Sequence, residues 1–286
     1  QVIDGCPAGL SLSESDIQAF LDRRRPGQSR YTTKRSETDQ VEILSGIFEG
    51  KTTGTPISLL VRNQDQRSRD YGEIASCYRP GHADYTFQNK YGFRDYRGGG
   101  RTSGRETIGR VAAGAVASAL LKTLGIKLTA FSKSIGPVTV PESEYRLDEV
   151  TENPLYMPNN GLAKKAADYL NEMMEQKDSC GGIIECRVTG LPVGLGEPVF
   201  DKLDAQLSKG IMSIGAVKAV EIGDGFLAAA SNGSTNNDAF AVQDGQMIKR
   251  TNHSGGVLGG ISDGSELIVR AAIKPTPSIA RPQSCL

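Results

Sequence analysis

The residue types most able to do chemistry gather between positions 79 and 110. This stretch holds six arginines against three acids, and it includes His82, one of two histidines in the chain. Three glycines, Gly98 to Gly100, are followed directly by Arg101-Thr102-Ser103. Glycines let a ligand approach the backbone closely, and arginines pair with phosphate and carboxylate oxygens through two parallel hydrogen bonds. The pattern predicts a site for ligands that carry several negative charges.

A helix is predicted to begin directly after these glycines and arginines. Ser103 and Glu106 have the spacing of a capping box, and an alanine-rich run with apolar residues three and four positions apart follows them. Gly125 marks the expected end of this helix. The amide groups and dipole of a helix N-terminus favour an anion, which agrees with the arginines. An ordinary glycine turn before a helix is the alternative interpretation.

The histidines and one proline-rich segment are further candidates. Arginines on both sides of His82 disfavour its protonated form, so it could act as a neutral hydrogen-bond partner or a proton carrier near neutral pH. A purely structural histidine is the alternative. His253 lies in a glycine-rich stretch that suits an aromatic ring or a tight turn equally well. The stiff segment Lys274 to Ser278 could hold a ribityl chain or phosphate, or could be a surface loop.

Helices and strands alternate irregularly along the chain. Helices are predicted at 13–25, 104–124, 162–176 and 198–208, and strands at 41–44, 56–61, 182–190 and, in short pieces, within 216–274. Residues 135–160 are predicted to form a surface excursion. This order, with 34 glycines, favours an α/β or α+β domain. The sequence contains neither a Gly-x-Gly-x-x-Gly fingerprint nor a Walker A motif.

The composition excludes several classes of protein. With 286 residues the chain can form one large domain or two ordinary ones. Lysine plus arginine equals aspartate plus glutamate at 33 each, which argues against a general nucleic-acid or membrane-surface binder. Five scattered cysteines indicate a reducing compartment, and two histidines make a zinc cluster improbable. We therefore expect a cytoplasmic protein with no metal, no nucleic acid and no membrane partner.

Several motifs together resemble the chorismate synthase family, in the same order and over nearly the whole chain. They are Asp22 to Gly27, Arg79 to Thr86, Arg94 to Thr107, Gly194 to Asp201, Val220 to Phe226 and Asn252 to Gly256. Thr102 and Gly104 stand where many members have Ser and Ala. Two family segments, Gly-Glu-Ser-His-Gly and Gly-Arg-His-Asp-Pro, would lie before Gln1 and after Leu286. Residues 1–286 are thus expected to form a chorismate synthase domain that lacks these terminal segments.

The resemblance implies a fold, a reaction and a cofactor. The expected fold is α+β, a β-α-β sandwich in a single large domain, usually assembled as a homotetramer with a deep basic cleft. The implied enzyme is a lyase that converts 5-enolpyruvylshikimate-3-phosphate to chorismate and phosphate by an anti 1,4-elimination, the last common step of the shikimate pathway. It needs reduced FMN without net redox change, and NADPH is a candidate reductant.

The resemblance also implies roles for particular residues. His82 matches the histidine that protonates the flavin, whereas the histidine that protonates the departing phosphate belongs to the N-terminal family segment. Arg24 and Arg30 would bind the anionic substrate or a nicotinamide nucleotide. The flavin-binding residues implied by family correspondence are Arg101, Thr102, Ser103, Gly215, Ala216, Gly259, Lys274, Pro275, Thr276, Pro277 and Ser278.

Two other functions are compatible with parts of the sequence. The run Arg97 to Arg101 resembles an arginine-glycine RNA-binding segment, although such segments occur in repetitive, strongly basic tracts and this one occurs once. A flavin oxidoreductase that turns over electrons is the second alternative. A flavin that is required but not consumed would distinguish the lyase from it.

Overall fold

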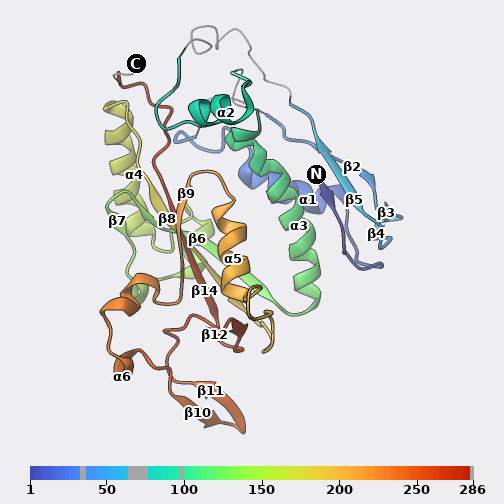
Figure 1. The fold of residues 1–286 in the computed structure, drawn as a ribbon, viewed down its shortest axis with the longest axis vertical. Coiled ribbons are helices and arrows are strands. Elements are labelled where there is room, and N and C mark those ends of the chain that lie inside the picture. Colours follow the sequence, from blue (N-terminus) through green and yellow to red (C-terminus); the bar gives the residue numbers. More distant parts are fainter. Residues whose placement is uncertain (33–36, 64–76, 97–99, 284–286) are drawn as a thin grey trace. The chain divides into compact units, whose positions relative to one another are not determined.

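The structure is a computed structural model that describes residues 1–32, 37–63, 77–96 and 100–283. It divides into two compact units, Gln1–Leu124 with Pro282–Leu286 and Gly125–Arg281, which we call the first and second unit. Both units contain helices and strands (Figure 1). The expected α+β class is therefore confirmed.

The first unit begins with a short antiparallel sheet and a helix whose ends follow the sequence. Helix α1 (Glu14–Arg24) starts at Ser13, whose hydroxyl accepts from the Asp16 amide while the Asp16 carboxylate accepts from the Ser13 amide, so the capping box is present. The sheet has the order β1 (Val2–Ile3), β5 (Ile57–Val61) and β2 (Val41–Ser45). A hairpin of β3 (Ile47–Phe48) and β4 (Lys51–Thr52) occupies the glycine-rich turn between β2 and β5.

The helix expected over 104–124 is divided in two. A 3-10 turn at Gly104–Glu106 precedes α3 (Thr107–Thr123), which ends before Gly125 as expected. Ser103 caps the 3-10 turn through the Arg105 amide, but the Glu106 carboxylate accepts from Arg110 at 3.3 Å. The capping box predicted here is thus wrong in its second half, because Arg110, one helical turn further on, takes the Glu106 carboxylate.

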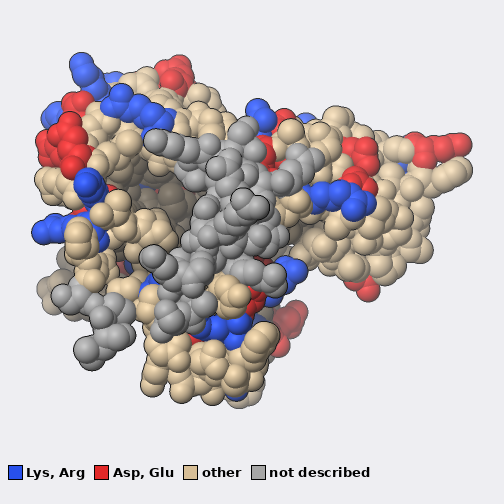
Figure 2. Space-filling model, turned by 90° about the horizontal axis from the view of Figure 1, so that it is seen from above, with Lys and Arg blue, Asp and Glu red and all other residues tan. Residues whose placement is uncertain are grey.

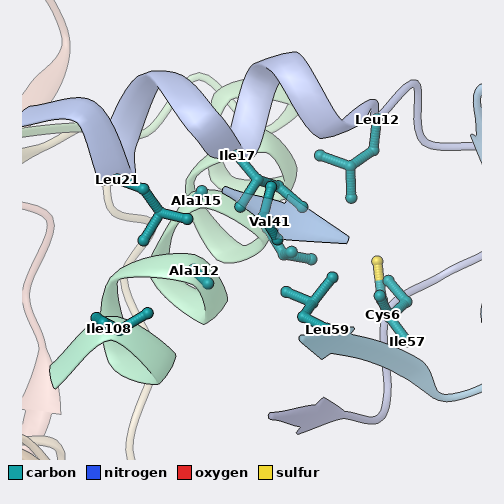
Figure 3. Close-up of a cluster of buried hydrophobic side chains, with 11 residues drawn as sticks. Cys6, Leu12, Ile17, Leu21, Val41, Ile57, Leu59, Ile108, Ala112 and Ala115 are labelled. Carbon is teal, nitrogen blue, oxygen red and sulfur yellow. The ribbon is translucent and has the colours of Figure 1, made fainter. Parts of the chain in front are cut away.

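The core of the first unit lies between α1, α3 and the sheet. Figure 3 shows Leu12, Ile17 and Leu21 directed towards α3 and the strands. Two of the four buried α3 residues in this cluster are alanines, whose small side chains allow the helices to pack closely. The buried hydrophobic residues of the cluster are Cys6, Leu12, Ile17, Leu21, Val41, Ile57, Leu59, Ile108, Ala112, Ala115 and Val116.

The second unit is built on a five-stranded antiparallel sheet. Its order is β7 (Val138–Thr139), β6 (Lys127–Ile135), β8 (Gly182–Thr189), β14 (Leu267–Ile273) and β9 (Val217–Ile222). Helices α4 (Asn160–Glu175) and α5 (Leu203–Met212) complete it, with the hairpin β10 (Phe240–Gln243) and β11 (Gln246–Lys249), the pair β12 (Val257–Leu258) and β13 (Ile261–Ser262), and the single turn α6 (Gly233–Asn236).

The second unit differs from the sequence predictions at one strand that they lack and at two segments that they describe wrongly. Strand β6 was not predicted, although it pairs with β8 over almost its whole length. The supposed surface excursion at 135–160 packs inward, since Val140 and Met157 are completely buried. Helix α5 begins at Leu203 instead of 198, because the β-bridge between Glu197 and Asp201 closes the preceding residues into a turn. Among the described residues, no helix is long and apolar enough to cross a membrane.

Candidate active site

The predicted anion-binding residues lie at the start of α3. Arg101 and Thr102 form an exposed 3-10 turn, η3 (Gly100–Thr102), in which Gly100 has a left-handed backbone with φ 52°. Ser103 follows, and its hydroxyl accepts a hydrogen bond from the Arg105 amide. Arg97, Gly98 and Gly99 lie outside the described residues. The described part of the loop thus leads directly into the helix N-terminus, as predicted from the sequence.

Arg24, at the end of α1, is tied to the start of α3. Its Nε and Nη2 donate to the Thr107 hydroxyl at 3.3 and 3.2 Å, and Nη2 also donates to the Gly104 carbonyl at 3.1 Å. Its Nη1 donates to Asp39 Oδ2 at 3.2 Å. A guanidinium group has five N–H groups, so these four bonds fix its plane and leave one N–H without an acceptor among the described residues.

Arg105 meets the same buried acid from the other side. Its Nη2 donates to Glu37 Oε2 at 3.1 Å and to the Arg62 carbonyl at 3.4 Å, and it lies 2.9 Å from Asp39 Oδ1. All of these contacts use one nitrogen. Glu37 and Asp39 are both buried. Pairing with the arginines offsets the cost of burying these two negative charges. Two arginines from different helical elements therefore share one acidic anchor.

The loop that carries His82 is closed around Asp84. The Asp84 carboxylate accepts from the Arg79 amide at 3.1 Å and from Arg79 Nε and Nη2 at 2.8 and 2.9 Å, and the His82 amide donates to the Arg79 carbonyl at 3.2 Å. The side-chain hydrogen bond from Arg79 holds the pKa of Asp84 at about 2, although burial opposes this shift. This carboxylate stays ionised and fixes the turn from which α2 (Asp84–Tyr91) begins.

A second arginine completes the closure of this loop. Arg94 Nη1 lies 3.5 Å from Asp84 Oδ1, and Arg94 Nη2 donates to the Cys77 carbonyl at 2.9 Å. The Arg94 guanidinium also lies over the Tyr78 ring, 5.3 Å from its centre, and Tyr78 packs edge-on against Tyr85. One carboxylate, that of Asp84, thus contacts two guanidinium groups and fixes the loop that carries His82.

Part of the predicted flavin-binding set comes together in the second unit. The Lys274 amide donates to the Ala216 carbonyl at 2.9 Å, which joins the segment after β14 to the loop before β9. Ala216 is held in a left-handed conformation, φ 74°, and a Cβ added to Gly215 would meet no atom within 4 Å. The Thr276 carbonyl accepts from the Ser179 hydroxyl at 2.7 Å, and the Ile279 amide donates to the Pro277 carbonyl. The hydrogen bond between Lys274 and Ala216 therefore brings two of the predicted flavin-binding segments together, and there is open space beside Gly215.

Gly259 lies near the N-terminus of α5, the helix whose C-terminus is followed by Gly215 and Ala216. The Leu203 amide, at the N-terminus of α5, donates to the Gly260 carbonyl at 2.8 Å, whereas Gly215 and Ala216 follow the C-terminus of α5. A ten-residue helix is about 15 Å long. The structure therefore separates Gly259 from Ala216 by the length of α5. Pro275 and Ser278, like Thr276, are exposed.

The last predicted ligand-binding residue, Arg30, is exposed after α1 and lies over the Tyr31 ring, 5.2 Å from its centre. Sequence reasoning missed the acids Glu37, Asp39 and Asp84, which organise the arginines. Two signals could have found them: an Asp five residues after Arg79 at a helix start, and two acids just before a predicted strand. In the sequence, Asp84 counts only as a charge that offsets arginine, and Glu37 and Asp39 count only as part of the total charge.

A contrasting polar network surrounds His253 in the second unit. The buried Lys249 ammonium lies 3.3 Å from Asp238 and 2.7 Å from Asp263, and it also donates to the Ser254 hydroxyl. Asp238 in turn accepts from the His253 amide at 2.8 Å, and His253 Nδ1 lies 2.7 Å from Asp224 Oδ2. Burial raises the pKa of Asp238, but hydrogen bonds from the loop outweigh burial and lower it overall.

Another cluster of buried charges lies on the sheet of the second unit. Glu185 is fully buried and accepts from Arg187 at 2.8 Å and from Arg270 at 2.7 Å, with Lys133 3.4 Å away. Burial raises the pKa of Glu185, but these arginines reverse the shift and lower it. Burial of Tyr145, together with the negative charge of Glu185, raises the pKa of Tyr145. These residues join β6, β8 and β14, so their evident role is to hold the sheet.

The surface charge of the molecule is mixed. On the face drawn in Figure 2, blue Lys and Arg groups and red Asp and Glu groups are interspersed, as expected for a chain with 33 of each. Attraction for an anion must therefore come from particular clusters and not from a general positive field. Among the described residues, no three His, Cys, Asp or Glu side chains are grouped so that they could hold a metal ion.

Arginines anchored on buried acids beside a helix start are typical of proteins that bind small, multiply charged anions. The family model described as chorismate synthase matches residues 1–286, and the chain belongs to the chorismate synthase family. Members of this family catalyse the last common step of the shikimate pathway, which leads to the aromatic amino acids. The protein is therefore an enzyme, a carbon–oxygen lyase.

Individual relatives agree with the family model. The chain is 64% identical over 282 residues to the chorismate synthase of Agathobacter rectalis, covering 99% of this chain and 77% of that protein. It is 54% identical over 287 residues to the chorismate synthase of Methanocella arvoryzae, covering 99% and 76%. A crystal structure of chorismate synthase matches with a TM-score of 0.81 and 33% identity, covering 96% of this chain and 79% of the other. The predicted family and fold are thereby confirmed.

Proposed function

We propose that the protein eliminates phosphate from 5-enolpyruvylshikimate-3-phosphate in the anti 1,4 sense, and that it requires reduced FMN to do so. The observation that carries the proposal is the family match over residues 1–286, combined with arginines anchored on buried acids beside the start of α3. The substrate brings one phosphate and two carboxylates. Each of these groups suits the forked donors of arginine better than a general positive surface.

Reduced FMN fits the chemistry of the residues that family correspondence assigns to it. Arg101, Thr102 and Ser103 precede a helix N-terminus, which suits an anionic group. Gly215 and Gly259 leave open space where a side chain would begin, and the Lys274 to Ser278 segment offers a cation and hydroxyls. When bound, reduced FMN would supply an electron-rich ring beside the substrate. NADPH is the proposed source of its electrons.

Proton transfer is assigned to His82 in this proposal. The Arg79–Asp84 closure fixes the backbone on both sides of this histidine. His82 matches the family histidine that protonates the flavin, and an imidazole is a side chain that can take up and return a proton near neutral pH. Arg24 and Arg30 would hold the anionic substrate, with a nicotinamide nucleotide as the alternative ligand.

The decisive experiment is an anaerobic assay with the full-length protein. Phosphate release from the substrate is followed with reduced FMN, with oxidised FMN and with no flavin. We expect release only with reduced FMN, and no net flavin oxidation during many turnovers. Full activity without flavin would refute the cofactor assignment, and stoichiometric flavin oxidation would favour an oxidoreductase. A parallel arm with NADPH and oxidised FMN tests whether the protein reduces its own flavin.

The assembly and location of the enzyme are part of the same proposal. We expect a homotetramer in the cytoplasm. Sedimentation velocity of the purified protein tests the first, since a monomer at micromolar concentration would contradict it. Four cysteines among the described residues are free thiols, Cys6, Cys77, Cys180 and Cys186, which agrees with a reducing compartment. Tight binding of single-stranded RNA, measured in the same preparation, would support the alternative interpretation of the arginine-glycine run.

A further inference from the structure

Asp39 is an unusual residue in the first unit. Its side chain has no exposed surface, and its backbone is left-handed with φ 45°, a conformation that Asp and Asn adopt more readily than most residues. It lies just before β2, yet its carboxylate meets Arg24 from the end of α1 and Arg105 from the start of α3. A buried charge is costly unless it is paired and hydrogen-bonded, and a hydrophobic residue of similar size is often at least as stable in its place. Stability alone therefore does not explain an Asp at this position.

The two carboxylate oxygens of Asp39 are used unequally. Oδ2 accepts a hydrogen bond from Arg24 Nη1 at 3.2 Å. Oδ1 lies 2.9 Å from Arg105 Nη2, but that nitrogen directs its hydrogen bonds to Glu37 and to the Arg62 carbonyl, and Oδ1 has no hydrogen-bond donor among the described residues. An arrangement selected for stability alone would satisfy both oxygens. The contact with Arg105 therefore works through charge and proximity.

Thr107 opposes Asp39 across the Arg24 guanidinium. Its hydroxyl accepts from Arg24 Nε and Nη2 while donating to the Gly104 carbonyl at 2.7 Å. Asp39 on one side and Thr107 on the other leave the guanidinium no freedom to rotate. Arg105, whose contacts all use Nη2, is likewise held at one end and keeps Nε and Nη1 without a partner in the described part of the chain.

We infer that Asp39, opposed by Thr107, is a positioning residue for substrate binding: it fixes the plane of Arg24 and draws Arg105 Nη2 towards it, so that the remaining N–H groups of both arginines meet the anionic substrate. This inference rests on the proposed function. Asp39 itself does not touch the ligand. Its negative charge weakens the attraction of the cluster for an anion, so a role in charge balance and a role in positioning predict opposite effects when the charge is removed.

The test is the Asp39→Asn variant of the full-length protein. Asn keeps the size of the side chain and tolerates the left-handed backbone. Binding of 5-enolpyruvylshikimate-3-phosphate to the enzyme loaded with oxidised FMN, where no turnover occurs, is measured by calorimetry. We expect the dissociation constant and the KM to rise about tenfold or more, as misplaced contacts cause, with a smaller change in kcat. FMN affinity, measured by fluorescence, should stay at the wild-type value.

Unchanged or tighter substrate binding by folded Asp39→Asn would overturn the inference and leave Asp39 as a charge-balancing group. A double-mutant cycle with Arg24→Lys gives a second criterion. If Asp39 acts through Arg24, the double variant binds no worse than the weaker single variant, whereas additive losses contradict positioning. If Asp39→Asn does not fold, Thr107→Val decides: weakened substrate binding supports the clamp, and wild-type binding refutes it.

The control is Glu42→Gln. Glu42 pairs with Arg62 at 2.7 Å in the same unit, but both side chains are largely exposed, so its loss should change neither affinity nor stability measurably. Failure of the wild-type enzyme to bind or convert the substrate would instead refute the proposed function. A wild-type enzyme that works, together with a normal Asp39→Asn variant, would refute only the positioning role.

Discussion

The surroundings of His82 and of His253 are electrostatic opposites. Beside His82, one buried carboxylate, Asp84, holds two arginines. Beside His253, one buried ammonium, Lys249, holds two aspartates. The charge at the centre of each arrangement therefore differs, negative beside His82 and positive beside His253. Each arrangement ties together the loop that carries its histidine.

The backbone around His253 is closely packed. The His253 loop is in close backbone contact with β9: a Cβ on Gly223 would lie 2.2 Å from the His253 carbonyl oxygen. The Asp224 amide also donates to that carbonyl at 2.8 Å, and the ring of His253 is paired with Asp224. We therefore interpret the His253 region as a structural loop, and the ligand-binding role proposed for the His82 region is what the predictions below test.

Removing Lys249 should give the largest effect. Lys249→Met leaves Asp238 and Asp263 buried without their cation, and we expect unfolding to become easier by about 3–5 kcal/mol, as for other broken buried pairs. Urea denaturation followed by circular dichroism measures this. Lys218→Met, at an exposed position on β9, is the control and should change little. Adding Asp263→Asn to Lys249→Met should restore part of the stability; no loss in Lys249→Met would mean that the network is not structural.

Removing each imidazole should separate the two regions by activity. His82→Ala should lower turnover by about a hundredfold or more while the fold remains intact, the scale of a lost acid–base group. His253→Ala should cost about 1 kcal/mol of stability, the worth of one hydrogen bond, and keep most of the turnover. Stopped-flow spectra of the reduced flavin should show a change of protonation state on substrate binding in the wild type, absent in His82→Ala. Wild-type turnover and spectra in that variant would make His82 structural.

The arginine at the helix start sharpens the comparison further. Arg101→Ala should weaken FMN or substrate binding by about 1.5–3 kcal/mol, the usual worth of a hydrogen bond to a charged group. Fluorescence titration of FMN and calorimetry with the substrate measure both affinities. Arg146→Ala, an exposed arginine of the second unit, is the matched control. Unchanged affinity for both ligands would show that the residues before Ser103 form only a turn.

The smallest expected effect is a dependence on acid pH. The pKa of Asp84 is lowered to about 2 from its usual 3.8, so the stability it contributes is complete above about pH 4 and is lost as pH falls towards 2. The difference in urea midpoint between the wild type and Asp84→Asn should therefore shrink between pH 5 and pH 2.5. A difference that stays constant over this range would mean that the Arg79 pair does not hold the loop. Low salt is required, because the Arg79 side chain is partly exposed.

Local signals in the sequence determined much of the fold. Ser13 and Asp16 predicted the start of α1, Gly125 the end of α3, and alternating apolar residues the strands β2 and β5, because these features depend on neighbours within one helical turn or one strand. The family resemblance likewise rested on ordered motifs. Strand β6 was not predicted because polar and apolar residues do not alternate cleanly along it, as Lys127 and Lys133 show. Its conformation depends on pairing with β8.

The sequence by itself determined which residue types would form the candidate site, and the tertiary structure decided what holds them. The arginines, glycines and His82 could be identified from their spacing, because a phosphate-binding loop needs those types close together in the chain. That Asp39 would meet Arg24 and Arg105, 15 and 66 positions away, could not, because the contact exists only once α1 and α3 pack. Pairing of a buried charge is a property of the folded neighbourhood, and no local pattern encodes it.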